Sequence, residues 1–258
     1  MAGTAPRIGL GIDIGGSGIK GAPVDLETGA FVEERMKIAT PQPSVPEAVA
    51  KAVTEIAAAF SAHIGSAAPL GVTFPGVIQH GVARSAANVD PSWIGTDVEQ
   101  LLADVAGRRT CVLNDADAAA VAEHRYGAAR DAKGVVLLTT LGTGIGTALL
   151  VDGRLVPNTE FGHLEIDGHD AETRAAASAK EREGLSYEQW ATERLQRYYS
   201  VVEKLLSPDL IVVGGGVSRE ADRFLPLLKL NTPIVPAVLR NTAGIVGAAV
   251  LARERFGG

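Results

Sequence analysis

Residues 8–25 read IGLGIDIGGSGIKGAPVD, and this stretch decides the fold. The run IGLGIDI (8–14) is rich in β-branched residues and stops at the glycine turn GGSG (15–18). A second strand, IKGAPVD (19–25), follows directly, and a third is expected within FVEERMKI (31–38). Short β-prone runs separated by turn residues predict a three-stranded meander.

The same pattern returns in residues 134–156, GVVLLTTLGTGIGTALLVDGRLV. Placing Asp13 against Thr140 aligns DIGGSGIKGAPVD with TLGTGIGTALLVD without a gap, so that Asp25 falls on Asp152. Self-similarity within one chain indicates internal duplication. The alternative is that two unrelated hairpins share the glycines that tight turns require.

Helices and further strands are expected after each meander. Ser44 with Glu47, and Ser186 with Gln189, have the spacing of capping boxes that open helices. The expected segments are a helix from Ser44, the strand PLGVTFPGV (69–77), a helix from Thr96 or Asp97 to Gly107, the strand TCVLND (110–115), a helix over ADAAAVAEHRYG (116–127), a helix at 186–206, the strand DLIVVGGG (209–216) and a terminal helix.

Two βββαβα-like units joined near residue 114 predict an α/β protein of two domains with an interdomain cleft. The first domain is expected at 1–114, completed by the C-terminal helix 241–258, and the second at 115–240. In open α/β sheets, ligands bind beyond the carboxyl ends of the strands. Since every glycine turn follows a strand, we expect these turns to face one crevice.

The composition is that of an ordinary globular protein, with 46% hydrophobic and 21% charged residues among 258. Disorder is therefore expected only in the first six or so residues and the last few. No run approaches the ~18 apolar residues of a membrane span, and no signal peptide is recognisable. Cys111 is the only cysteine, which excludes disulfides and cysteine-rich zinc sites and predicts a reducing, cytoplasmic location. A net charge of −6 argues against a nucleic-acid binder.

Three glycine turns follow strands, at 15–18, 142–146 and 214–216. Backbone N–H groups in such turns can approach an anion closely. None of the turns matches the P-loop pattern or the Rossmann fingerprint, so both of those nucleotide-binding classes are disfavoured. Asp13 precedes the first turn and is the candidate to hold Mg²⁺, through water. The alternatives are that the glycines serve only the hairpins and that Asp13 only accepts turn hydrogen bonds.

Two polar groups are candidates for binding a sugar acceptor. Asn114 and Asp115 end a buried strand where a helix begins, so they could simply cap that helix. The functional interpretation makes Asp115 the general base that takes a proton from an attacking hydroxyl. The second group, Asn158, Glu160 and His163 with Glu172 nearby, offers the carboxylates and amides that chelate vicinal hydroxyls. A purely structural role for His163 is the alternative.

These segments resemble the ROK sugar kinases, within the larger actin–hexokinase superfamily. The motifs that carry the resemblance are DIGGSGIK, TFPGV, AANVDPSW, LNDADAAA, LGTGIGTALLVDG, EFGHLEIDG and IVVGGG, and they span nearly the whole chain. The resemblance implies a two-domain actin/hexokinase-like (ribonuclease H-like) fold. It also implies that Asp115 is the catalytic base.

The resemblance assigns further residues to two substrates. For glucose, these are Asn88, Asn114, Asp115, Glu160, His163 and Glu172. For the phosphate donor, they are Asp13, Gly15, Gly16, Ser17, Lys20, Thr140, Gly142, Thr143 and Gly144, with Gly214, Gly215 and Gly216 on the nucleotide-side loop. Gly18 closes the first glycine turn and completes the donor set.

The chain departs from many ROK proteins because it lacks the CxCGxxGCxE zinc segment, so no zinc is expected. This shortened loop, VDPSWIGTD and KEREGLSYEQW resemble the polyphosphate glucokinase branch, which implies transfer from inorganic polyphosphate, alone or alongside ATP. Such a donor needs a track of cations. The candidates are Lys180, Arg182, Arg197 and Lys204, with Arg84, Arg108 and Arg109 elsewhere.

The expected function is therefore a Mg²⁺-dependent polyphosphate glucokinase that phosphorylates the 6-hydroxyl of glucose. The alternatives are an ATP-dependent ROK glucokinase or glucomannokinase and, less favoured, a non-catalytic sugar-binding ROK regulator. Because the first strand starts at residue 8, we expect no helix-turn-helix module ahead of it. A homodimer is expected from the family, with no nucleic-acid or membrane partner.

Overall fold

The computed structural model describes residues 8–65 and 68–257. The disorder predicted for the first six residues lies outside these ranges, as does part of that predicted for the last few. Within the described ranges, no helix is both long enough and apolar enough to cross a membrane. Contacts divide the chain into two compact units, each described by itself below. Unit 1 runs to Ala122 and includes the segment from Thr242 onward, and unit 2 is Glu123–Asn241.

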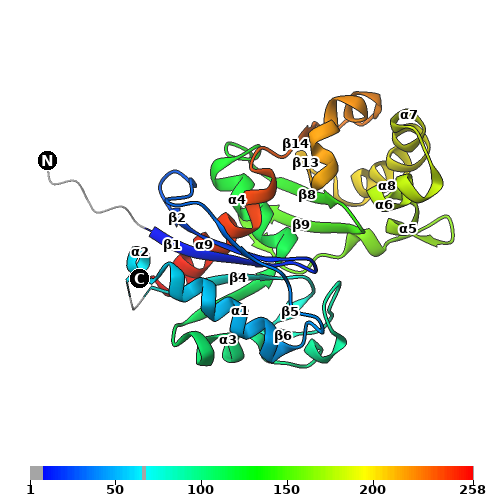
Figure 1. The fold of residues 1–258 in the computed structure, drawn as a ribbon. Helices are drawn as coiled ribbons and strands as arrows, with labels where there is room; N and C mark the ends of the chain where they lie inside the picture. Colours follow the sequence, from blue (N-terminus) through cyan, green and yellow to red (C-terminus); the bar gives the residue numbers. More distant parts are fainter. Residues whose placement is uncertain (1–7, 66–67, 258) are drawn as a thin grey trace, which may run out of the picture. The chain divides into compact units, whose positions relative to one another are not determined.

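Unit 1 is built on a five-stranded sheet of order β3-β2-β1-β4-β7 (Figure 1). The first three strands form the predicted antiparallel meander, and β4 and β7 continue the sheet parallel to β1. A two-stranded β5–β6 hairpin lies outside this sheet. The strands are β1 (Ile8–Ile14), β2 (Ile19–Asp25), β3 (Met36–Ile38), β4 (Leu70–Phe74), β5 (Ile78–Gln79), β6 (Val82–Ala83) and β7 (Thr110–Asn114).

Unit 2 repeats this arrangement in a five-stranded sheet of order β10-β9-β8-β13-β14. Again a three-stranded antiparallel meander is extended by two parallel strands, so the predicted duplication is confirmed. A β11–β12 hairpin lies apart from the sheet. The strands are β8 (Val135–Leu141), β9 (Ile145–Val151), β10 (Arg154–Val156), β11 (Glu165–Ile166), β12 (His169–Asp170), β13 (Leu210–Gly214) and β14 (Ile234–Pro236).

The gapless alignment of the two meanders is wrong by one residue after the turn. In unit 1 the hairpin closes on the pair Ile14↔Ile19, which leaves four residues in the turn. In unit 2 it closes on Leu141↔Ile145, which leaves three. Asp25 pairs with the first residue of β1, and Val151 rather than Asp152 pairs with the first residue of β8.

The helices follow the predicted order. The α-helices are α1 (Pro46–Ala59), α2 (Ser61–Ile64), α3 (Val98–Ala106), α4 (Asp115–Tyr126), α5 (Glu172–Ala175), α6 (Ala177–Glu183), α7 (Tyr187–Gln189), α8 (Gln196–Leu206) and α9 (Ala243–Phe256). Short 3₁₀ segments are η1 (Pro91–Trp93), η2 (Phe161–His163), η4 (Gly216–Arg223), η5 (Leu225–Leu227) and η6 (Arg240–Thr242). A π-helical turn, η3 (Trp190–Leu195), joins α7 to α8 within the predicted helix 186–206.

One predicted capping box is present and the other is absent. Ser186 accepts a hydrogen bond from the backbone of Gln189, whose side chain accepts one from the Ser186 backbone, as predicted. Helix α1 begins at Pro46 without a side-chain cap, so the box at Ser44 is wrong. The reason is tertiary: the Ser44 hydroxyl accepts instead from the Asp90 backbone N–H at 3.0 Å.

Helix α9 packs onto the sheet of unit 1 through glycines. A Cβ added at Gly11 on β1 would lie 1.9 Å from the carbonyl oxygen of Ile245, and one at Gly71 on β4 would lie 1.9 Å from that of Ala248. The missing side chains therefore let the helix backbone approach the strands directly. The contact division falls within α4, after Ala122, whereas the sequence-based boundary falls before α4. That boundary stays a prediction.

The core of unit 2 lies between its sheet and the helix of residues 187–206. Trp190, Tyr198 and Tyr199 are fully buried there against Leu137 and Ile211. The aromatic side chains that the sequence places along this helix are thus core residues. The indole N–H of Trp190 donates to the Ala175 carbonyl at 3.0 Å, which connects this core to the loop that carries Glu172.

Candidate active site

Asp13 lies at the carboxyl end of β1, directly before the first glycine turn. Its Oδ1 accepts from the Thr73 hydroxyl at 2.7 Å, and its Oδ2 lies 3.7 Å from Lys20 Nζ. The side chain is 25% exposed, so it can still face a ligand. Because one oxygen is already hydrogen-bonded and the other faces an ammonium, the geometry suits a metal held through water better than one bound directly.

The first glycine turn is closed by a backbone hydrogen bond from Gly15 N to Gly18 O at 3.2 Å. Asn88 lies against this turn, since a Cβ on Gly16 would be 2.8 Å from both the Cβ and the carbonyl oxygen of Asn88. Asn88 is exposed and has a positive φ of 61°, a conformation that Asn tolerates. The structure therefore brings a predicted sugar ligand next to a predicted phosphate turn.

Asn114 and Asp115 occupy the junction of β7 and α4. Asn114 Oδ1 accepts from the backbone N–H of Ala116 at 2.8 Å, so the capping role considered for this residue is real. Its Nδ2 donates to the Gly76 carbonyl at 3.2 Å, which ties the ends of β4 and β7 together. Asp115 is exposed, and its Oδ1 also accepts from Ala116 N at 2.9 Å. This bond orients the carboxylate without burying it.

Two glycine turns of unit 2 lie side by side at the ends of adjacent parallel strands. Gly214 on β13 pairs with Thr140 on β8. Gly215, with φ of 84°, lies so close to the next residue of β8 that a Cβ would be 2.4 Å from the Leu141 carbonyl oxygen. Ser178 supports the turn after β8, because its hydroxyl donates to the Thr143 carbonyl at 2.6 Å. The turns that begin at Gly142 and Gly214 thus follow neighbouring strand ends.

The loop with the predicted sugar ligands of unit 2 is packed directly on this turn. A Cβ on Gly162 would lie 2.2 Å from the Ile145 carbonyl oxygen. On its other side, Ile145 donates its backbone N–H to Glu172 Oε2 at 2.9 Å. Gly144 also lies close to this carboxylate, since a Cβ on it would be 2.3 Å from the same oxygen of the Glu172 side chain. In unit 2, the predicted donor-binding turn and the predicted sugar-binding segment are therefore in direct contact.

Glu160 and His163 show perturbed titration. Partial burial raises the pKa of Glu160, the Glu172 charge adds to the increase, and His163 opposes it. The hydrogen bond from His163 to Asp170 raises the pKa of the imidazole, and partial burial opposes this. Carboxyl and imidazole groups can donate or accept hydrogen bonds with sugar hydroxyls, according to their protonation state. Perturbed pKa values of neighbouring residues are typical of functional sites.

Within the described ranges, three side chains come close enough to share a metal ion. His163, Asp170 and Glu172 each have a ligand atom within 4.8 Å of the others. All three are engaged in hydrogen bonds of the protein itself. A cation here would have to compete with these bonds. We therefore treat the group as a hydrogen-bonded cluster.

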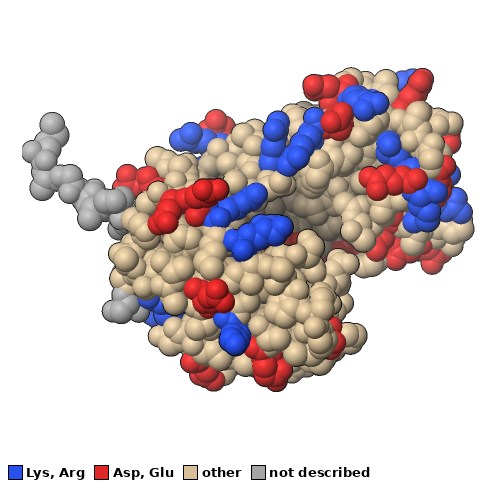
Figure 2. Space-filling model, in the orientation of Figure 1, with Lys and Arg blue, Asp and Glu red and all other residues tan. Residues whose placement is uncertain are grey.

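Three of the cations predicted to bind polyphosphate, Lys180, Arg182 and Arg197, are engaged by neighbouring groups. Arg197 is paired through two hydrogen bonds with Asp167, and Arg182 donates to the Thr173 carbonyl and pairs with Glu183. Lys180 lies 4.2 Å from the centre of the Tyr187 ring. On the face of α5–α8 seen in Figure 2, acidic and basic side chains are interspersed. No purely cationic stripe runs across that face.

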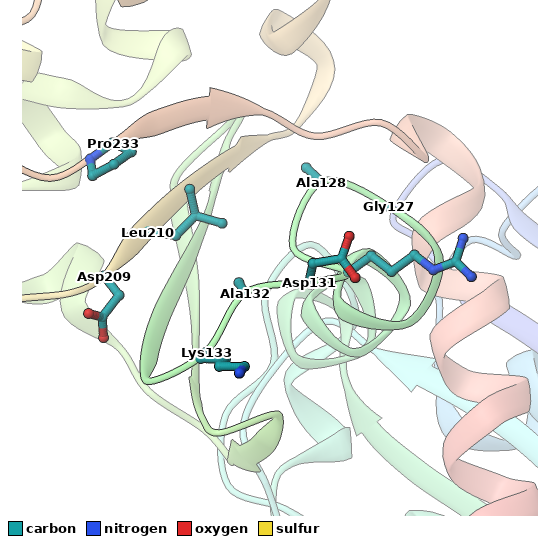
Figure 3. Close-up of a pocket in the computed structure, with 9 residues that line it drawn as sticks. Gly127, Ala128, Asp131, Ala132, Lys133, Asp209, Leu210 and Pro233 are labelled. Atoms are coloured by element: carbon teal, nitrogen blue, oxygen red, sulfur yellow. The ribbon is translucent and has the colours of Figure 1, made fainter.

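A surface hollow of about 360 Å³ in unit 2 lies away from these turns. Figure 3 shows Leu210 and Pro233 on one side of it and Ala128, Asp131 and Ala132 on the other. Asp209, which lines the hollow, accepts from the backbone N–H of Val135 at 2.7 Å. Val135 begins β8 and Asp209 precedes β13, so the hollow lies at the amino-terminal ends of these strands. The glycine turns follow their carboxyl ends. It is not part of the candidate site.

In each unit, candidate glycine turns and polar side chains thus lie at the carboxyl ends of the strands, and comparison with known proteins gives the chain a family. A family model described as the ROK family matches residues 9–178. The chain belongs to the ROK family. A polyphosphate glucokinase of Mycobacterium tuberculosis is 53% identical over 248 residues, which cover 96% of this chain and 92% of that protein.

Solved ROK structures agree with this assignment. The inorganic polyphosphate/ATP-glucomannokinase of Arthrobacter sp. strain KM superposes with a TM-score of 0.90 at 58% identity, covering 96% of this chain and 99% of that one. A ROK family glucokinase from Streptomyces griseus, crystallised with glucose and AMPPNP, gives 0.78 at 24% identity, covering 96% and 99%. The second likeness is one of fold alone. The predicted actin/hexokinase-like fold class is confirmed.

Three residues of the site were missed in the sequence. Thr73 donates to Asp13, Ser178 supports the second glycine turn, and Asp170 holds His163. Thr73 lies inside the quoted motif TFPGV, which was a usable signal. Asp170 and Ser178 lie in short elements whose packing local sequence patterns do not reveal.

Proposed function

We propose that this chain transfers the terminal phosphoryl group of inorganic polyphosphate to the 6-hydroxyl of glucose, giving glucose 6-phosphate. The observation that carries the proposal is the 53% identity, over 96% of the chain, to a protein named polyphosphate glucokinase. A second such protein, from Mycobacterium leprae, is also 53% identical over 96% of this chain. The site adds the chemistry that such a reaction needs.

In this proposal, Asp115 is the catalytic base. It accepts the proton of the 6-hydroxyl as that oxygen bonds to the terminal phosphorus and the bridging P–O bond to the rest of the polyphosphate breaks. Its exposure and its hydrogen bond to Ala116 N support the role, because a base must be both accessible and oriented. Asn114 fixes the strand end from which Asp115 projects.

The donor is held by backbone amides of the glycine turns. In unit 1 these are Gly15, Gly16, Ser17 and Gly18, and in unit 2 Thr140, Gly142, Thr143 and Gly144 with Gly214 to Gly216. Lys20 adds a positive charge near the first turn. Asp13 would hold Mg²⁺ through water, and the bound ion would neutralise charge on the transferring phosphoryl group. The partly exposed, already hydrogen-bonded carboxylate of Asp13 supports a water-mediated site.

Glucose hydroxyls are bound by Asn88 and Asn114 of unit 1 and by Glu160, His163 and Glu172 of unit 2. Carboxylate, amide and imidazole groups offer both donors and acceptors, which vicinal hydroxyls require. The contacts of Asn88 with Gly16 and of Glu172 with Ile145 support this assignment, since they place acceptor ligands beside donor turns within each unit. We further propose that the protein is a homodimer, as the family resemblance implies, and that it works in the cytoplasm, which its single cysteine favours.

A second candidate function is favoured by one comparison. The Arthrobacter structure at 58% identity is named for both polyphosphate and ATP as donors and for both glucose and mannose as acceptors. Dual donor use and mannose phosphorylation are therefore the runner-up for this chain. An ATP-only glucokinase is the third.

A donor and acceptor panel tests these alternatives. Purified protein with Mg²⁺ is given glucose or mannose, and either polyphosphate freed of nucleotides or ATP, while hexose 6-phosphate is measured. Polyphosphate with glucose should give the highest kcat/KM. If hexose 6-phosphate forms with ATP but not with polyphosphate, the proposal is contradicted and the ATP-only glucokinase remains. If it forms with neither donor, the protein is not a hexose kinase.

A further inference from the structure

His163 and Asp170 form a short, directed pair in unit 2. His163 Nδ1 lies 2.8 Å from Asp170 Oδ2. An ionised carboxylate can only accept at this distance, so Nδ1 carries the proton. At a pH above the raised pKa of His163, the imidazole is neutral and presents an unprotonated Nε2 as an acceptor. This tautomer is set by Asp170 and not by the sugar.

The same carboxylate also organises Glu172. Its second oxygen, Oδ1, accepts from the backbone N–H of Glu172 at 3.2 Å, at the start of α5. The Asp170 carbonyl accepts from the Thr173 hydroxyl at 2.6 Å, and Asp170 pairs with Glu165 across the β11–β12 hairpin. Asp170 is therefore held from several sides. One fixed carboxylate controls the orientation of two predicted sugar ligands.

We propose that Asp170 is a positioning residue for sugar recognition, which holds the His163 imidazole with Nε2 free to accept a hydrogen bond from a glucose hydroxyl and sets the first turn that carries Glu172. This inference rests on the proposed function, because it takes His163 and Glu172 as glucose ligands. Without Asp170, the imidazole loses its fixed tautomer and gains rotational freedom. That freedom must be lost again when glucose binds, which weakens binding.

The matched control is a second carboxylate in the same hairpin. Asp167 lies at the β11–β12 turn, with φ of 53°, and Gly168 follows with φ of 75°. Asn is favoured in such a turn, so Asp167→Asn removes one charge three positions from Asp170 and keeps the backbone. The Asp167 carboxylate is engaged by Arg197 through two hydrogen bonds.

The first experiment separates KM from kcat. Asp170→Ala and Asp170→Asn should raise the KM for glucose by about tenfold or more, by analogy with the loss of activity when the carboxylate behind a metal-bound histidine is removed. The KM for polyphosphate should change much less, and Asp167→Asn should resemble wild type in both constants. If wild-type protein is active and both Asp170 variants keep its KM for glucose, the role of Asp170 is wrong but the proposed function is unaffected. Inactive wild-type protein would instead remove the proposed function.

The second experiment tests whether Asp170 acts through His163. In a double-mutant cycle, Asp170→Asn should cost much less glucose kcat/KM in a His163→Gln background than in wild type, because the imidazole that it positions is gone. Fully additive losses would show a general structural role and overturn the inference. Nitrogen NMR of the His163 ring gives a readout independent of activity: wild type should show the Nδ1-protonated tautomer, and Asp170→Asn a mixture. The Nε2-protonated tautomer in wild type would also overturn it.

Discussion

Ile145 donates its backbone N–H to Glu172 at 2.9 Å, so the residue that ends the second glycine turn is tied to a predicted sugar ligand. Gly162 packs against the carbonyl oxygen of the same residue. The backbone of Ile145 is therefore held on both sides by the loop of residues 160–172. In unit 2, the elements proposed to bind donor and acceptor cannot move independently of each other.

This relationship predicts different effects for two substitutions of Glu172. Glu172→Gln keeps an oxygen that can accept from Ile145 N, so it should mainly raise the KM for glucose. Glu172→Ala leaves that N–H without its partner and should raise the KM for both glucose and polyphosphate, each by about tenfold, the effect of roughly 1.4 kcal/mol. Steady-state kinetics with each substrate varied in turn would check this. Equal effects of the two variants on polyphosphate KM would contradict it.

Gly162→Ala should destabilise unit 2 and disturb the sugar loop. The new Cβ would lie 2.2 Å from a backbone oxygen, which cannot move aside as a flexible side chain can. Overpacking of this kind costs about 1–3 kcal/mol. Thermal unfolding should show a clear fall in Tm, whereas Gly142→Ala, whose Cβ meets nothing within 4 Å, should keep its Tm. A wild-type Tm for Gly162→Ala would show that the contact is looser than described.

His163 should make stability depend on pH in a defined direction. Its pKa is raised in the folded protein, chiefly by the hydrogen bond to Asp170. Folding therefore favours the protonated form, so the stabilisation is fully present below the unfolded pKa of about 6.5 and is lost as pH rises through the higher folded value. The difference in Tm between wild type and His163→Gln should be larger at pH 6 than at pH 8. A difference that grows with pH would contradict this sign.

The buried carboxylate of Glu123, which is not one of the predicted ligand residues, predicts an effect on stability. This carboxylate is 1% exposed and accepts from the backbone N–H groups of Ala128 at 2.7 Å, Val238 at 3.1 Å and Leu239 at 2.6 Å. Glu123→Gln turns one acceptor into a donor that faces these N–H groups, at a cost of about 1–3 kcal/mol. Urea unfolding should show the loss, while the exposed control Glu188→Gln should be near neutral. Equal stability of the two variants would contradict the account.

The duplicated sheet was predictable because its signals are local. Glycine turns between β-prone runs identify both meanders, and the strand orders of the two sheets confirm them. The two wrong predictions, the capping box at Ser44 and the register of the second meander, depend on contacts between residues far apart in the sequence or on different strands. Ser44 has the spacing of a cap, yet its hydroxyl bonds to Asp90, 46 residues away. The register after the second turn differs because that turn is one residue shorter, which only strand pairing reveals.

The candidate site shows the same division. Its glycines, Asp115 and Glu160 stand in recognisable motifs, so residue type and spacing suffice to select them. Asp170 could not be selected in this way, because its role follows from a contact with His163 across a two-stranded hairpin. For the cations, the sequence selects residues whose charge is already engaged within the protein. Arg182 and Arg197 are candidates by charge alone, but each is engaged by a neighbouring acceptor.

Asp115→Asn tests whether Asp115 is the catalytic base. Asn keeps the shape of the side chain but cannot take the proton of the sugar hydroxyl, so kcat with polyphosphate and glucose should fall by about 10²- to 10⁴-fold. Glucose binding, followed by calorimetry, should stay near the wild-type affinity, and Asp104→Asn on the exposed face of α3 serves as the control. We therefore expect Asp115→Asn to lose turnover while it still binds glucose. Turnover of Asp115→Asn within a few fold of wild type would contradict it.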